Sequence, residues 1–284
     1  MIYDFDRTLS VEDVQNYAFF PMLGMSPKEF WRLTDEYMEE HWVDDIVAYL
    51  HLMISESGSR GIPLTRDLLN DMGKDVEFHP GVKGWFSLMD GFCNGIGADV
   101  EHYVISSGVR ETILGTSISN EFTDVFACEY LYDKDGVAIG PKTIVNRMGK
   151  AEKVLDIGEH IPFENMVYIG DGETDIPCMD MVRSKGGCSI AVYSNDVTKG
   201  QCEWMLREGH VDFIAPADYR EGKELYSIVS EILLNRIRSL PSRSFLERHV
   251  RFQTHMYNRY GSDADSISLS FRYRRTHWKR NVRP

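Results

Sequence analysis

The sequence predicts an α/β fold: a mostly parallel sheet with helices on both faces and an all-helical segment inserted after the first strand. Short apolar runs end in acids, hydroxyls or glycines at three widely separated places, near residues 4, 106 and 171. From residue 81 to about 235 such runs alternate with helical patterns, as in parallel βαβ units. Residues 11–80 show helical periodicity alone, which indicates the insertion.

Composition is that of a globular protein with a proper core. The 284 residues are 43% apolar, with a mean hydropathy of −0.32. No run approaches the ~20 apolar residues of a membrane span, and the N-terminus lacks the pattern of a secretory signal. The five cysteines form no C-x-x-C pair, so we expect reduced thiols in a cytoplasmic protein.

The charge is unevenly distributed. The net charge is −13, yet residues 236–284 hold twelve Arg or Lys against three acids, about +9, which leaves −22 for residues 1–235. A body that acidic is a poor nucleic-acid binder. Residues 271–280 interleave aromatics with cations, which leaves a minor possibility of nucleic-acid binding by the tail. We expect 236–284 to be a basic, disordered tail.

The first strand, residues 1–3, delivers Asp4 to its carboxyl end, where parallel sheets place reactive groups. Asp6 points the same way if the chain stays extended. Two such carboxylates can bind a divalent cation or divide the roles of nucleophile and proton donor. The alternative is a pair of solvated turn residues. Three residues make a short central strand, which a start codon assigned slightly too late would explain.

The inserted segment is predicted to hold four helices. Ser26 and Pro27 form a helix start, residues 57–63 break the pattern, and residues 79–81 return the chain to the sheet. The predicted helices are 12–20, 27–40, 43–55 and 65–72. Such an insertion can cover a site, exclude water and choose the substrate.

After a helix at 82–93, the second strand is predicted at 102–106. It ends in Ser106, Ser107 and Gly108, whose hydroxyls and backbone N–H groups suit phosphate oxygens. An ordinary helix N-cap is the alternative for these residues. A third strand at 125–127 and a hairpin of 129–132 with 137–139 follow.

Lys150 opens the next predicted helix, 21 residues before Asp171, and a lysine suits a transferring phosphoryl group. Lys142 and Lys153 compete for this role, and the helix-opening position favours Lys150. A strand at 166–170 leads into Asp171 and Asp175, with glycines at 170 and 172 that permit a tight turn. The last strands are predicted at 188–192 and 211–215.

This ordered set of motifs resembles the haloacid dehalogenase-like superfamily, in its phosphoserine-phosphatase-like branch. The resemblance covers roughly residues 1 to 230, and its motifs are Asp4 to Thr8, Ser106, Lys150, and Gly170 to Asp175. It implies a Rossmann-like catalytic core from residues 1–10 and 81–235, with residues 11–80 as a helical cap of the C1 type.

The resemblance also implies roles. Asp4 would take the phosphoryl group as an aspartyl phosphate, and Asp6 would act as general acid and then base. Ser106 would hydrogen-bond the phosphoryl oxygens, helped by the Ser107 N–H. Lys150 would neutralise developing charge and restrain Asp4.

Magnesium follows from the same resemblance and, independently, from charge. The family pattern gives Mg²⁺ the Asp4 carboxylate, the Asp6 carbonyl and Asp171, with Asp175 orienting the ligands. One lysine cannot balance four acids and a phosphate dianion, so a divalent metal is required. Oxygen ligands favour Mg²⁺ over Zn²⁺.

We therefore expect a Mg²⁺-dependent phosphatase of a small phosphorylated metabolite. A phosphotransferase of the same fold, or a non-catalytic phosphate- or partner-binding module, remains the alternative. Asp13, with Glu12 beside it, matches the position that holds the substrate's amino group in phosphoserine phosphatases. Arg60 and Arg66 are only candidates for the substrate carboxylate, and Arg7 departs from the small or polar residue usual there, so the substrate stays open.

Overall fold

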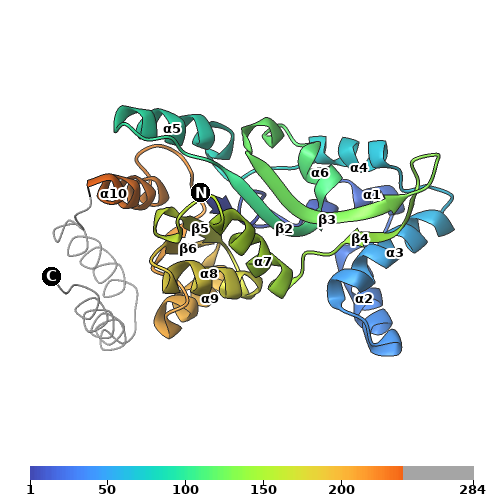
Figure 1. Cartoon of the computed structure of the whole chain (residues 1–284). Helices are drawn as coiled ribbons and strands as arrows, with labels where there is room; N and C mark the ends of the chain where they lie inside the picture. Colours follow the sequence, from blue (N-terminus) through green and yellow to red (C-terminus); the bar gives the residue numbers. More distant parts are fainter. Residues whose placement is uncertain (239–284) are drawn as a thin grey trace.

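The computed structural model describes residues 1–238 and contains one seven-stranded sheet (Figure 1). Its strand order is β4-β3-β2-β1-β5-β6-β7, and every neighbouring pair is parallel except β3 with β4. The predicted fold class is thus confirmed. The strands are β1 (Ile2–Tyr3), β2 (Tyr103–Val109), β3 (Asp124–Tyr132), β4 (Ala138–Thr143), β5 (Val167–Gly170), β6 (Cys188–Tyr193) and β7 (Phe213–Pro216).

Helices cover both faces of the sheet, and each layer has its own apolar cluster. On one face lie α5 (Val82–Gly95), α6 (Arg110–Leu114) and α10 (Glu224–Arg238). On the other lie α7 (Arg147–Gly158), α8 (Ile176–Ser184) and α9 (Asp196–Glu208). Successive side chains of the short central strand β1 point to opposite faces of the sheet. Ile2 packs into the cluster under α7, α8 and α9, and Tyr3 packs into the cluster under α5, α6 and α10.

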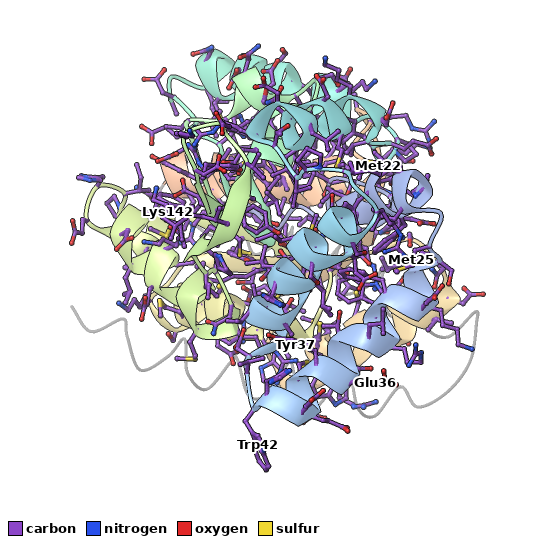
Figure 2. The ribbon with its side chains drawn as sticks, turned by 90° about the vertical axis from the view of Figure 1, so that its right-hand side faces the viewer. Met22, Met25, Glu36, Tyr37, Trp42 and Lys142 are labelled. Atoms are coloured by element: carbon purple, nitrogen blue, oxygen red, sulfur yellow. The ribbon has the colours of Figure 1, made fainter. Side chains whose placement is uncertain are left out.

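The segment between β1 and α5 is helical, as predicted, but begins differently. Its helices are α1 (Phe19–Leu23), α2 (Pro27–His41), α3 (Asp45–Ser59) and α4 (Arg66–Met72), and Figure 2 shows α2 ending at Trp42 beside α3. The predicted helix 12–20 is wrong, since only a 3-10 turn (Val14–Asn16) precedes α1. Contacts with other segments hold the start of this stretch on a non-helical path: the Val11 N–H donates to the Glu77 carbonyl (3.0 Å) and the Val14 N–H to the Asp6 carboxylate (2.8 Å). Within the stretch, the Tyr17 hydroxyl accepts from the Glu12 N–H (2.8 Å).

The side-chain caps explain where the later helices start. The Ser26 hydroxyl accepts from the Glu29 N–H (3.2 Å), the Asp44 carboxylate from Ile46, and the Thr65 hydroxyl from Leu68 (3.1 Å). These three caps begin α2, α3 and α4, close to the predicted starts.

The β3–β4 hairpin reaches past the sheet and packs against the inserted helices (Figure 1). The Tyr130 hydroxyl donates to the Leu50 carbonyl of α3 (3.1 Å), and the Ala138 N–H donates to the Leu64 carbonyl (2.9 Å). The predicted third strand and first hairpin arm are therefore one continuous strand, β3. The hairpin links the insertion to the edge of the sheet.

Helix α10 is described as far as Arg238, where the described residues end, and so includes the first three residues of the predicted tail, 236–238. The rest of the predicted basic tail lies outside the described residues. Within residues 1–238, no helix combines the length and the apolar character needed to cross a membrane.

Candidate active site

The loop after β1 carries the first acids and is held from outside the motif. Asp4 continues the ladder by donating its N–H to β5 (2.9 Å). Arg7 then adopts a left-handed φ of 58°, an uncommon conformation for a residue with a side chain. A His79 ring nitrogen lies 3.1 Å from the Arg7 carbonyl, and the Tyr219 hydroxyl donates to the Thr8 carbonyl (2.8 Å). These contacts hold the loop that carries Asp4 and Asp6.

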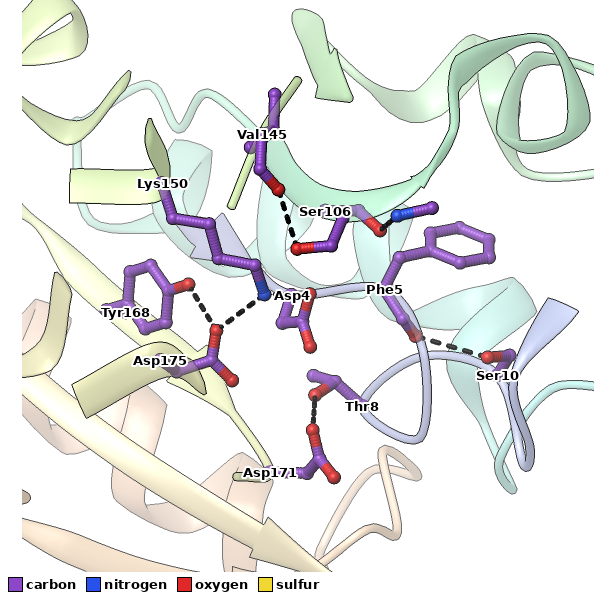
Figure 3. Close-up of polar contacts among 12 residues, drawn as sticks. Asp4, Phe5, Thr8, Ser10, Ser106, Val145, Lys150, Tyr168, Asp171 and Asp175 are labelled. Carbon is purple, nitrogen blue, oxygen red and sulfur yellow. Dashed lines mark hydrogen bonds and ion pairs between the residues drawn. The ribbon is translucent and has the colours of Figure 1, made fainter. Parts of the chain in front are cut away.

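Lys150, from the first turns of α7, joins two of the acids. Its Nζ donates to Asp4 Oδ1 (2.7 Å) and to Asp175 Oδ1 (2.9 Å), which also accepts from the Tyr168 hydroxyl (2.8 Å; Figure 3). Lys150 is only 2% exposed. Burial alone would lower the pKa of Lys150, but the Asp175 and Asp4 carboxylates outweigh it and raise that pKa. The lysine is thus held charged between the two acids.

Three carboxylates converge beside this lysine. One oxygen from each of Asp4, Asp171 and Asp175 lies within 4.8 Å of the others, and Thr8 donates to Asp171 Oδ1 (3.4 Å; Figure 3). Asp175 Oδ2 is buried without a hydrogen-bond partner. Burial raises the pKa of Asp4 to about 6, with Asp175 adding to the effect, and raises the pKa of Asp171 well above its usual range. An all-oxygen set with a shortage of positive charge and an unpartnered oxygen fits a hard divalent cation.

Asp6 lies outside that cluster of carboxylates. Its Oδ1 accepts the Val14 N–H (2.8 Å), and its Oδ2 lies against Gly108, where a Cβ would come within 3.1 Å. Burial raises the pKa of Asp6 to about 8, and Asp13 and Asp4 add to this shift. The structure therefore separates Asp6 from the carboxylates that could bind metal and places it at the end of β2.

The two predicted serines differ in position. Ser106 is fully buried, and its Oγ accepts the Gly108 N–H (2.9 Å). The Ser107 hydroxyl donates to the Val145 carbonyl (2.7 Å), and its own carbonyl accepts from the Tyr49 hydroxyl of α3. Ser107 and Gly108 line the cavity described next, whereas Ser106 is not part of its lining.

A cavity of about 650 Å³ opens over these acids. Its floor comes from the sheet edge, with Asp4, Asp6, Lys150 and Asp171 among the lining residues. Its opposite wall comes from the inserted helices and is formed by Trp31, Thr34, Asp35 and Met38 of α2 and Asp45, Ile46 and Tyr49 of α3. The insertion thus supplies the wall of the cavity opposite the acids.

Asp13, Arg60 and Arg66 are the remaining residues that the sequence suggested for substrate binding. Asp13 lines the cavity, but its carboxylate pairs with Arg7 (2.7 Å). Neither candidate for a substrate carboxylate lines it: Arg60 pairs with Glu56 (2.6 Å), and Arg66 lies over the Tyr132 ring.

The two competing lysines stay at the surface, where Lys142 pairs with Glu129 and Lys153 with Asp156 (both 2.7 Å). Of the three lysines, Lys150 is the one that contacts Asp4; its role stays a prediction.

Sequence reasoning missed three contributors. Tyr168 sits within an apolar strand, where its buried hydroxyl needs a partner, and that need could have pointed to Asp175. Tyr49 and Gln15 line the cavity from the insertion, and nothing in the local pattern distinguishes them from ordinary helical residues.

Solved structures share this fold at low sequence identity. A phosphoserine phosphatase with an analogue of the phospho-aspartyl intermediate has a TM-score of 0.54 and 19% identity, covering 80% of this chain and 95% of that one. A probable phosphoserine phosphatase from Vibrio cholerae has a TM-score of 0.56 and 14% identity over 84% of this chain and 65% of that one. For a HAD family hydrolase from Salmonella enterica serovar Typhi the values are 0.51 and 19%, and the match spans 70% of this chain and 63% of that one.

Comparison of sequences identifies the family, which the shared fold alone does not. A Borreliella burgdorferi protein, itself uncharacterized, is 24% identical over 274 residues, which is 81% of this chain and 95% of its own. The sequence model of the haloacid dehalogenase-like hydrolases matches residues 1–180, the stretch that contains Asp4, Lys150 and Asp171. The chain therefore belongs to the haloacid dehalogenase-like hydrolase family.

Proposed function

We propose that this protein is a Mg²⁺-dependent phosphatase that hydrolyses a small phosphomonoester through an aspartyl phosphate. The observation that carries the proposal is the ion-paired set of Lys150 between Asp4 and Asp175, beside three converging carboxylates and at the floor of the cavity. Phosphoryl transfer needs an in-line nucleophile and dense positive charge, and little else from the protein. The phosphoserine phosphatases that share the fold are consistent with this chemistry.

The metal would be held by Asp4, Asp171 and Asp175, with the Asp6 carbonyl as the further oxygen that the family pattern implies. When bound, the ion supplies positive charge that offsets both the carboxylates and the phosphoryl oxygens. Carboxylate oxygens favour Mg²⁺ over Zn²⁺, which prefers nitrogen and sulfur ligands.

The protein's own residues perform the bond changes. An Asp4 carboxylate oxygen attacks phosphorus, the bond from phosphorus to the alcohol oxygen breaks, and Asp6 gives its proton to that oxygen. Water then attacks the same phosphorus and gives a proton to Asp6, which releases inorganic phosphate and restores the Asp4 carboxylate. Lys150 holds Asp4 Oδ1, while Gly108 and the Ser107 N–H face the phosphoryl oxygens from the end of β2.

The inserted helices would act as the substrate-selecting cap, of the C1 type, over a core formed by residues 1–10 and 81–235. Their contribution to the cavity wall supports this division. We also place the protein in the cytoplasm, and the five cysteines, all free and buried, are in keeping with a reducing compartment.

The nucleophile can be tested by Asp4→Asn, which keeps the side-chain shape and removes the attacking carboxylate. Turnover of p-nitrophenyl phosphate should fall by at least about a thousandfold while the circular dichroism spectrum stays unchanged. Substrate labelled at phosphorus should leave acid-stable, base-labile label on the parent protein and none on the variant. Turnover within tenfold of the parent would contradict the covalent route.

Metal dependence is tested separately. EDTA should abolish activity, Mg²⁺ should restore it, and Ca²⁺ should restore it poorly, because calcium takes longer bonds and more ligands than in-line transfer tolerates. Full activity in metal-free buffer would refute the metal assignment.

A further inference from the structure

The wall that the inserted helices present to the cavity is acidic. Asp35 of α2 and Asp45 of α3 both line it, and both are exposed. Neither forms an ion pair with another residue among 1–238, and the one hydrogen bond of the Asp45 carboxylate is with the adjacent Ile46 N–H. Within the described residues, two carboxylates without a cationic partner therefore line the side of the cavity opposite Asp4 and Lys150.

Among residues 1–238, no free cation lines the cavity to balance them. The basic residues of this described part that line it are Arg7 and Lys150. Arg7 pairs with Asp13 (2.7 Å), and Lys150 is shared by Asp4 and Asp175. A leaving group that carries a carboxylate, as phosphoserine does, would lose water without gaining a cationic partner, and would meet like charge.

The same wall carries groups that suit a cation. Trp31 is half-buried and contacts Tyr49 edge to face, with ring centroids 6.0 Å apart, and both line the cavity. Aromatic faces beside carboxylates attract ammonium groups. Gln15 is only 6% exposed and lines the cavity, and its side-chain amide has no hydrogen-bond partner within residues 1–238. Its carbonyl oxygen can accept from an ammonium or a hydroxyl.

We propose that the substrates are phosphomonoesters whose alcohol carries an ammonium group and no carboxylate, in other words phosphorylated amino alcohols. This rests on the proposed phosphatase function. The ammonium lies between Asp35 and Asp45 and against the Trp31 and Tyr49 rings, with Gln15 as a further acceptor. Arg7 stays paired with Asp13, so neither side chain provides a site for a carboxylate.

The first test compares kcat/KM with Mg²⁺ for phosphoethanolamine, phosphocholine, phosphoserine, glycerol 3-phosphate and p-nitrophenyl phosphate. At least one of the two ammonium esters should exceed both phosphoserine and glycerol 3-phosphate by tenfold or more. Which of the two leads distinguishes a hydrogen-bonded ammonium from a quaternary one. Phosphoserine or glycerol 3-phosphate at parity would overturn the inference.

Hydrolysis of p-nitrophenyl phosphate distinguishes failure of the proposed substrate preference from failure of the proposed phosphatase function. If p-nitrophenyl phosphate is hydrolysed but the amino-alcohol esters are not preferred, the inference fails and the phosphatase function stands. If no ester is hydrolysed with Mg²⁺, the proposed function fails and the inference fails with it.

The second test removes the two carboxylates with the double variant Asp35→Asn/Asp45→Asn. The ratio of kcat/KM for the preferred ammonium ester to that for p-nitrophenyl phosphate should fall tenfold or more. Glu36→Gln is the matched control, because Glu36 lies on α2 next to Asp35, pairs with Arg32 and does not line the cavity (Figure 2). Its ratio should stay that of the parent; an equal fall in both variants would overturn the inference.

A binding measurement serves as a readout that needs no turnover. Calorimetry on Asp4→Asn with Mg²⁺ should show phosphoethanolamine or phosphocholine binding at least tenfold more tightly than phosphoserine. Equal affinities would contradict the inference.

Discussion

The Lys150 ammonium offsets the electrostatic repulsion between the buried carboxylates of Asp4 and Asp175. Asp4 and Asp175 are both buried, and both accept hydrogen bonds from this one ammonium, at 2.7 and 2.9 Å. Removing one member of a buried ion pair leaves an uncompensated charge, which costs far more than the pair itself contributes. We therefore expect Lys150 to contribute to stability as well as to the proposed chemistry.

We expect Lys150→Met to lower the free energy of unfolding by about 3 kcal/mol or more in metal-free buffer, as loss of a buried partner does. Urea unfolding in EDTA measures it. Lys153→Met is the matched control on the same helix, because its pair with Asp156 is 32% and 51% exposed. Exposed pairs contribute little, so this control should change stability by no more than about 0.5 kcal/mol. Equal losses in both variants would mean that Lys150 has no special electrostatic role.

The turn after β5 brings the second acidic motif into place. A Cβ at Gly170 would lie 2.4 Å from Asp175 Oδ2, so the absence of a side chain lets the carboxylate pack against the strand end. Gly172, two residues later, has open space where its Cβ would be, and an extended φ of −141°. Packing thus requires a glycine at 170, whereas neither space nor backbone conformation requires one at 172.

Gly170→Ala should displace Asp175 from Lys150 and reduce kcat at least about tenfold, because a shift of about an ångström in a catalytic group costs roughly that or more. Gly172→Ala should stay within about threefold of the parent, since no atom opposes the added methyl group. Phosphate release from p-nitrophenyl phosphate measures both. Similar losses in the two variants would show that the turn needs glycine for flexibility and not for space.

Elements whose signals are local could be predicted from the sequence. Strand ends near Asp4 and Asp171 follow from apolar runs that stop at acids, and α2 starts where Ser26 and Pro27 predict. The helix predicted at 12–20 failed because the chain there is held by contacts with other segments, from the Val11 N–H to the Glu77 carbonyl and from the Val14 N–H to Asp6, which periodicity cannot register. The insertion's cavity wall was equally hidden, since it depends on how α2 and α3 pack over the sheet.

At the scale of the molecule, the site is assembled from distant segments. The contact of Lys150 with Asp4 spans 146 residues and that of Asp171 with Thr8 spans 163. Parallel strands make this possible, because their carboxyl ends meet at one edge of the sheet. Sequence order could therefore predict which residues meet, but not that Ser106 lies outside the cavity lining or that Asp13 is paired with Arg7.

The opposite layer of the sheet contains a second polar group of residues, which bears on global stability. His102 is buried, with its Nδ1 2.9 Å from the Tyr3 hydroxyl, which itself accepts from Trp85 Nε1 (2.9 Å). Its Nε2 faces Asp90 Oδ1 at 3.4 Å. Burial lowers the pKa of His102 to about 4, and the Met1 ammonium adds to this while Asp90 opposes it. The imidazole is thus neutral in the folded protein at pH values where an unfolded chain would protonate it.

The sign of the pH dependence follows from linkage. The usual histidine pKa is 6.5, and that of His102 in the folded protein is about 4. Between these two pH values the unfolded chain is protonated at His102 and the folded chain is not. The contribution of His102 to stability is therefore lost as the pH falls through this window. The loss should approach about 3 kcal/mol at the acid end. Other groups titrate here too, so the informative quantity is the difference from His102→Asn, measured by urea unfolding at pH 7.5, 6 and 5. The variant should lose less stability with acid than the parent, and His160→Asn, at an exposed position, should follow the parent. If His102→Asn loses as much stability as the parent between pH 7.5 and 5, protonation of the buried imidazole is not the cause of the loss.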